Sequence, residues 1–89
     1  MKRVREVLDD AAWKIQDWSK FLKDIWSHRL EEHIASIRDS VSHGSLMNAI
    51  MLCITLQQKA ELIHLTTQSV VGEWIRIIKE AMKKLEELR

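Results

Sequence analysis

Glu61 and His64 are the two residues whose types and spacing come nearest to a metal site. Two copies of the spacing Glu-x-x-His, joined by further glutamates, can hold a pair of metal ions between helices. This chain carries the spacing once, and no inward pair of additional glutamates is evident. We therefore expect no metal and no cofactor, with Glu61 and His64 as weak candidate ligands.

A cluster of hydroxyl groups and one imidazole surrounds Gly44, in the order Ser40, Ser42, His43 and Ser45. Such residues serve as helix caps and turn residues far more often than as nucleophiles. Nothing near them resembles a site for an oxyanion. We expect no catalytic residues and no enzymatic activity.

Four tryptophans offer a third kind of chemistry, the binding of a small aromatic ligand. A hairpin folded about Gly44 would bring Trp13 near Trp74 and Trp18 near Ser69, with small or polar groups such as Thr67 beside them. A pocket lined by these five residues is one hypothesis. The alternative is that the tryptophans pack against small neighbours in an ordinary core.

The elements that must position these residues are helices. The chain has no proline and two glycines, which are the residues that interrupt helices most strongly. Gly44 can end one helix and Ser45 can cap the next. The sequence thus predicts an all-α fold with helices over about 2–42 and 46–88, each near 60 Å at 1.5 Å per residue. Poor helix propensity in TTQS supports an alternative of three helices, with a break near 66–69.

Apolar residues repeat at steps of three and four along both halves, as in coiled coils. The first half slips by one position between Ile25 and Trp26, which we interpret as local unwinding of a continuous helix. The repeat in the second half consists of Leu46, Ala49, Cys53, Leu56, Ala60, Ile63, Thr67, Val70, Trp74, Ile77 and Ala81.

A second apolar repeat lies on roughly the opposite side of the second half. Lys59 and Glu61 are the only Lys, Arg, Asp or Glu residues between Ser40 and Gly72. A lone hairpin would leave this second face in water, and exposed apolar patches of that kind mark association surfaces. We expect a homodimer, in which two hairpins form a four-helix bundle. Its interface would comprise Met47, Met51, Ile54, Leu62, Leu65 and Ile75.

Bulk properties exclude several classes of partner. The 89 residues correspond to a single helical domain, 1–89, and the formal charge of +1 provides no field for nucleic acid. The lone Cys53 excludes an intramolecular disulfide, and its apolar neighbours indicate a buried thiol. The apolar run from Leu46 to Leu56 is too short to span a bilayer, and the N-terminus lacks the pattern of a signal peptide. We expect a soluble protein of cytoplasmic type, with no nucleic-acid or membrane partner.

The two ends of the chain carry a resemblance. MKRVREVLDDAA, residues 1–12, and KEAMKKLEELR, residues 79–89, look like computationally designed helical bundles, whose surfaces are filled with Lys, Glu and Arg. The resemblance covers about a quarter of the chain and implies an engineered or de novo designed helical bundle. The centre departs from it, because idealised designs normally avoid such methionines, tryptophans and cysteine.

These observations predict a non-enzymatic helical bundle that associates with itself. One alternative is a bundle with a tryptophan-lined pocket that binds or transforms a small molecule. Another is a recognition module whose second apolar face receives a foreign amphipathic helix.

Overall fold

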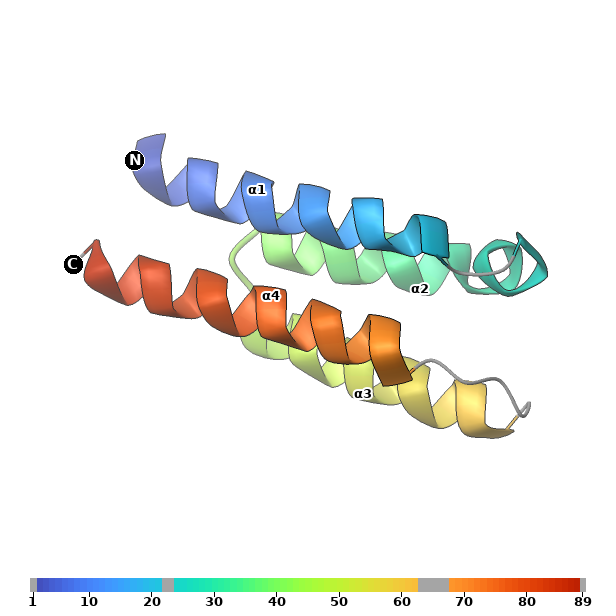
Figure 1. Cartoon of the computed structure of the whole chain (residues 1–89). Coiled ribbons are helices and arrows are strands. Elements are labelled where there is room, and N and C mark those ends of the chain that lie inside the picture. The colour runs from blue at the N-terminus through green and yellow to red at the C-terminus, as the bar shows by residue number, and fades with distance from the viewer. Residues whose placement is uncertain (1, 22–23, 63–67, 89) are drawn as a thin grey trace.

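The computed structural model describes residues 2–21, 24–62 and 68–88, which are helical except for the turn at 43–45 and the last residue, 88. The elements are α1 (Lys2–Trp18), the 3-10 turn η1 (Ser19–Phe21), α2 (Asp24–Ser42), α3 (Leu46–Leu62) and α4 (Gln68–Glu87). Figure 1 shows α1 beside α4, and α2 beside α3, with both termini at the same end. The described residues confirm the predicted all-α class.

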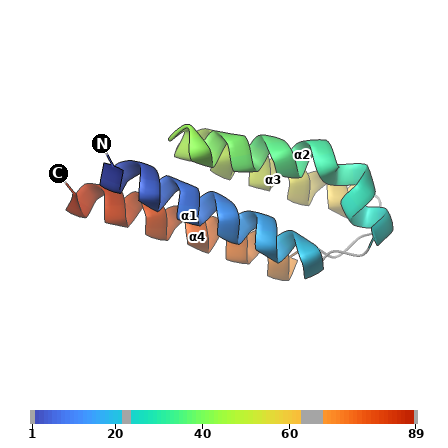
Figure 2. The same cartoon turned by 90° about the horizontal axis from the view of Figure 1, so that it is seen from above.

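The four α-helices of the described residues form an elongated bundle of 42 × 18 × 18 Å. Each helix packs against two others, in the closed order α1, α2, α3, α4 and back to α1. Figure 2 shows the same arrangement from above. The predicted four-helix bundle combined two helices from each of two chains, whereas the described residues of a single chain form four α-helices.

The junction between α2 and α3 follows the prediction, because the backbone there closes a Schellman motif. Gly44 has φ +78°, its N–H donates to the Val41 carbonyl (3.0 Å), and the Ser45 N–H donates to the Ser40 carbonyl (2.8 Å). These bonds satisfy carbonyls at the end of α2 that have no partner within the helix. The Ser45 carbonyl then accepts from Ala49 (3.0 Å) and begins α3.

The predicted continuous helix over 2–42 is wrong. α1 ends at Trp18, the chain tightens into η1, and α2 then packs back along α1. The Ser19 hydroxyl donates to the Gln16 carbonyl (2.5 Å), a local bond that competes with the helical pattern. The chain thus reverses a few residues before the one-position slip of the apolar repeat between Ile25 and Trp26, which falls within α2.

The predicted continuous helix over 46–88 is also wrong. α3 ends at Leu62 and α4 begins at Gln68, and the two helices lie side by side. The alternative prediction, a break near 66–69, came closer to the observed end of α3 and start of α4, although it assumed three helices in total. Residues 66 and 67 lie outside the described part of the chain, and Gln68 and Ser69 already belong to α4.

The core lies along the axis of the bundle and receives side chains from all four helices. The apolar repeat predicted for the second half is buried at every described position, and so are Leu8, Ala11 and Ile15 of α1 and Leu30, Ile34, Ile37 and Val41 of α2. The repeat therefore identified the core even though the helices that carry it are half as long as predicted.

Candidate interaction surface on α3

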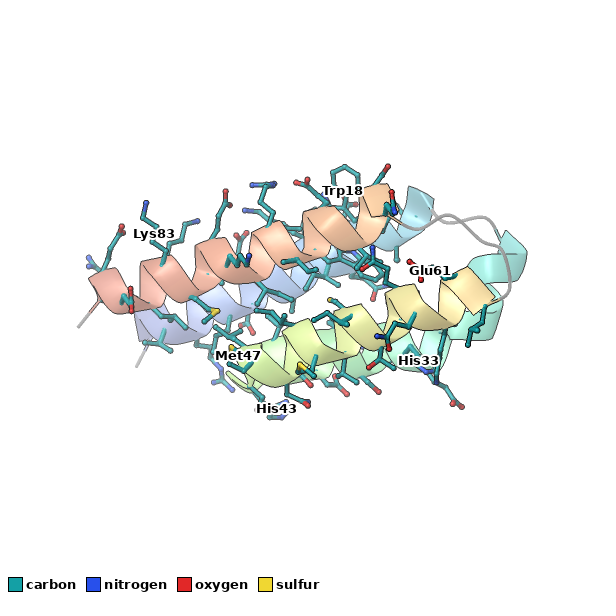
Figure 3. The ribbon with its side chains drawn as sticks, turned by 90° about the horizontal axis from the view of Figure 1, so that it is seen from below. Trp18, His33, His43, Met47, Glu61 and Lys83 are labelled. Carbon is teal, nitrogen blue, oxygen red and sulfur yellow. The ribbon has the colours of Figure 1, made fainter. Side chains whose placement is uncertain are left out.

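Large apolar side chains stand in solvent along α3. Leu62 is 80% exposed, Met47 63% and Met51 57%, and Ile54 belongs to the same exposed set. We call these four residues the α3 outer face. They extend over 16 positions, which separates the first from the last by about 22 Å at 1.5 Å per residue. Figure 3 shows Met47 near one end of α3 and Glu61 near the other.

The opposite side of α3 explains why this face points outward. Ala49, Cys53, Leu56 and Ala60 are completely buried, and Leu46 is nearly so. Those five residues follow steps of three and four, and so they define one stripe of the helix. The bundle buries only that stripe of α3, because α2 and α4 are the helices with which α3 makes substantial contact. The side chains of the α3 outer face are therefore not part of the core of the single chain.

Polar contacts fasten α3 to α2 on one flank of this face. The Lys59 ammonium donates to Nε2 of His33 (2.6 Å), and the Asn48 amide donates to the Ser40 hydroxyl (2.9 Å). Lys59 thus has a hydrogen-bond partner within the chain. Glu61 is exposed and forms no ion pair within the described residues. The centre of the α3 outer face carries Thr55 and Gln58 and no charge.

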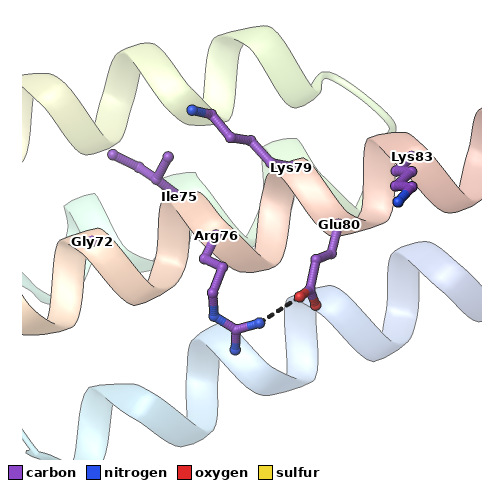
Figure 4. Close-up of a pocket in the computed structure, with 6 residues that line it drawn as sticks. All are labelled: Gly72, Ile75, Arg76, Lys79, Glu80 and Lys83. Atoms are coloured by element: carbon purple, nitrogen blue, oxygen red, sulfur yellow. Dashed lines mark hydrogen bonds and ion pairs between the residues drawn. The ribbon is translucent and has the colours of Figure 1, made fainter.

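The neighbouring helix α4 carries a shallow hollow on its own surface. This hollow has a volume of about 430 Å³, is open to solvent, and is lined by Gly72, Ile75, Arg76, Lys79, Glu80 and Lys83. Figure 4 shows Ile75 and Lys79 extending toward α3, and Arg76 and Glu80 extending toward α1. A Cβ added at Gly72 would meet nothing within 4 Å, so the missing side chain contributes to the hollow.

The predicted interface residues fall into three groups. Met47, Met51, Ile54 and Leu62 are exposed on α3, and Ile75 is half-buried against the core from α4. Leu65 lies outside the described residues. Sequence analysis missed Gly72 and Lys79, and the signal available for Gly72 was a glycine inside an otherwise well-formed helix.

The proposed tryptophan pocket is not assembled as predicted. Trp13 is 65% exposed on α1, whereas Trp74 is fully buried in the core. Trp18 is half-buried against that core, Ser69 is exposed, and Thr67 lies outside the described residues. Trp13 projects into solvent because the apolar stripe of α1 passes through Ala11, Ala12 and Ile15 instead.

The indole N–H of Trp74 is buried and has no hydrogen-bond partner among the described residues, and the same holds for Nδ1 of His33. Burying an unpaired N–H is unfavourable, typically by about 1–3 kcal/mol. Each is one isolated polar group. Neither Trp74 nor His33 lines the hollows described on α1 and α4. Neither group forms a binding site by itself.

The described residues among the metal candidates and the hydroxyl cluster lie on α3 and around the turn between α2 and α3. Glu61 is exposed on α3, and His64 lies outside the described residues. No group of three or more His, Cys, Asp or Glu side chains that could hold a metal ion occurs in the described part. The His43 ring contacts the Asp39 carbonyl (2.7 Å), and Ser40 bonds Asn48, so the groups at the turn serve local structure.

Cys53 lies in the core, and burial raises the pKa of its thiol to about 12. A thiol is nucleophilic only as the thiolate, so this residue is unreactive in the folded protein at neutral pH.

Among the helices described, none combines the length and the apolar character needed to cross a membrane. No protein-family model, no curated protein and no solved structure matches this chain. The α3 outer face, with its neighbouring hollow on α4, is thus the candidate functional surface on the strength of its own chemistry.

Proposed function

We propose that the protein is a non-enzymatic helical bundle that associates with itself through the α3 outer face. The observation that carries the proposal is the exposure of Met47, Met51, Ile54 and Leu62 on a helix whose opposite side is already fully used by the core. Four such side chains form a patch of roughly a few hundred Å², the size at which apolar surface marks association.

The chemistry of the face favours a helical protein partner over a small molecule. It is long, narrow and convex, whereas sites for small molecules are concave. Methionine side chains adapt to irregular neighbours and recur at surfaces that bind helices. The polar groups at its centre, Thr55 and Gln58, are uncharged, so their burial costs less than that of a lysine or glutamate.

Replacing Met51 and Ile54 together by Glu tests the proposal. Two carboxylates at the centre of the interface would be buried without partners, so the dissociation constant should rise by at least about 100-fold. Light scattering coupled to size exclusion, over a range of concentrations, measures the change. Circular dichroism should show an unchanged helical fold, because both side chains are exposed in the single chain.

Trp13→Glu is the matched control. It also replaces an exposed apolar residue by a carboxylate, but on α1, away from the α3 outer face. The control should keep the oligomeric mass of the unsubstituted protein. If the double α3 variant kept that mass too, self-association through this face would be refuted. A monomeric unsubstituted protein would instead leave the face open to a foreign amphipathic helix, which is the competing function.

A further inference from the structure

We infer that the partner on the α3 outer face is a second copy of this chain, packed with its own α3 antiparallel about a two-fold axis between Ile54 and Thr55. The inference rests on the proposed self-association and adds to it an orientation, a register and a pair of charge contacts. Two-fold dimers use the same patch on both subunits, so the patch must be complementary to itself when it is turned over.

The α3 outer face meets this requirement. Its midpoint falls between Ile54 and Thr55, and a two-fold axis there places Met47 against the partner's Leu62. The same operation places Met51 against the partner's Gln58 and Ile54 against the partner's Thr55. The two most exposed apolar residues, at the ends of the face, therefore cover one another, and the less exposed Ile54 lies at the axis.

Charges on both sides of the face favour the antiparallel orientation. α4 runs back along α3, so Lys79 and Lys83, in the second half of α4, lie toward the end of α3 that carries Met47. Figure 3 shows Lys83 toward the Met47 end of the molecule and Glu61 toward the other end. Within one chain these charges are separated by the length of the face.

A two-fold axis across the helices brings the partner's Glu61 to the end that carries Lys79 and Lys83. The Lys79 side chain already extends toward α3 from the edge of the hollow (Figure 4). The partner's Glu61 would also lie near the N-terminus of α3, where the helix dipole favours a negative charge. A parallel dimer would instead set Glu61 against the partner's Glu61, and like charges disfavour that arrangement.

The buried area is consistent with a dimer of modest affinity. A standard interface buries about 800 Å² per partner, and the four apolar side chains alone supply roughly half of that. Thr55 and Gln58 extend the same surface on α3, and Ile75 extends toward α3 from the neighbouring helix α4 (Figure 4). The remaining contact area would come from these additional residues on α3 and α4.

Cross-linking between two variants that each carry one added cysteine tests the register. Met47→Cys and Leu62→Cys are prepared separately, and each alters an exposed side chain that the fold does not need. Under mild oxidation, the mixture of the two variants should give a disulfide-linked dimer, whereas either variant alone should give none. The unsubstituted protein is the control for Cys53, which is buried.

The outcomes separate this inference from the proposed function. Cross-linking of each variant with itself would indicate parallel packing and overturn the inference. A protein that has dimeric mass but forms no cross-link in the mixture would overturn the register while self-association stands. A monomeric mass at all concentrations would overturn both.

Charge reversal supplies an independent arm. Glu61→Lys should weaken the dimer by about 5-fold or more, and so should Lys79→Glu combined with Lys83→Glu. All three substitutions in one chain should restore most of the affinity, because the charges are then exchanged. Glu31→Lys, the same change on α2, should leave the affinity unaltered. Failure of the triple variant to recover affinity would overturn the proposed pairing.

Discussion

Helices α3 and α4 lie side by side in one bundle, yet their solvent-facing sides differ. α4 buries Val70, Val71, Trp74, Ile77, Ile78 and Ala81, and its outer side carries charged residues. There Arg76 donates from Nε to Glu73 and from Nη1 to Glu80 (2.6 Å), and its hydrogen bonds hold the pKa of Glu73 below the usual range. α3 buries a similar stripe, but its outer side is largely apolar.

The difference teaches how to separate stability from function in a small bundle. For α4, the packing within the chain accounts for both sides of the helix: an apolar stripe inside and a solvated charged surface outside. For α3, the inner stripe satisfies the bundle, and the methionines and leucine outside add nothing to it. Residues that the fold does not require are the ones to examine for a partner.

The largest predicted effect contrasts the two sides of α3 with the same substitution. Leu56→Ala removes a fully buried side chain and leaves a cavity, so the free energy of unfolding should fall by about 2–5 kcal/mol. Leu62→Ala, at 80% exposure, should change the stability of the monomer by less than about 0.5 kcal/mol. Urea denaturation, at a protein concentration too low for self-association, measures both changes in the free energy of unfolding. Similar losses would show that the two sides of α3 are not distinct.

A second effect concerns the inner side of α3 at high pH. Because burial raises the pKa of Cys53 from 9.0 to about 12, the folded state retains the thiol proton that the unfolded state releases. This stabilisation is complete below pH 9 and is lost as the pH rises toward 12, by about 1.4 kcal/mol per pH unit. Unfolding titrations between pH 8 and pH 11 should show a steeper loss than in Cys53→Ala. Parallel curves for the two proteins would contradict the burial of this thiol.

The smallest effects are expected at the two glycines, and they have opposite signs. Gly44→Ala forces a side chain into a left-handed conformation and should cost about 1–2 kcal/mol of stability. Gly72→Ala lies within α4 with open space around the added methyl group and should raise stability by about 0.5–1 kcal/mol. Thermal unfolding monitored by circular dichroism measures both shifts. A destabilising Gly72→Ala would mean that the outer side of α4 is more crowded than the structure has it.

Sequence reasoning predicted the parts of the fold that depend on local pattern. The apolar repeat located the inner stripe of α3 and α4, and Gly44 located the turn between α2 and α3. Both follow from steric and hydrophobic rules that act over a few residues. The exposed positions of Met47, Met51, Ile54 and Leu62 opposite that stripe also agree with the second repeat.

The helix end between α1 and α2 was not predicted, and a break between α3 and α4 was predicted only as an alternative, near 66–69. An apolar repeat can keep its phase across a short connection, as it does from Ala60 to Val70, so regular spacing does not prove a continuous helix. The deciding factor is global, because each of the four described helices buries its apolar stripe in one shared core. The tryptophan pocket was not predicted correctly for a different reason: α1 does lie beside α4, but Trp13 faces solvent whereas Trp74 is buried in the core.

The solution mass of the unsubstituted protein tests the central claim most directly. Light scattering coupled to size exclusion, over concentrations from below micromolar to near millimolar, would follow the mass of the 89-residue chain. Self-association through the α3 outer face predicts a reversible rise from one chain mass to two, and a plateau there, because a two-fold interface closes on itself. A constant mass of one chain at every concentration would contradict the claim.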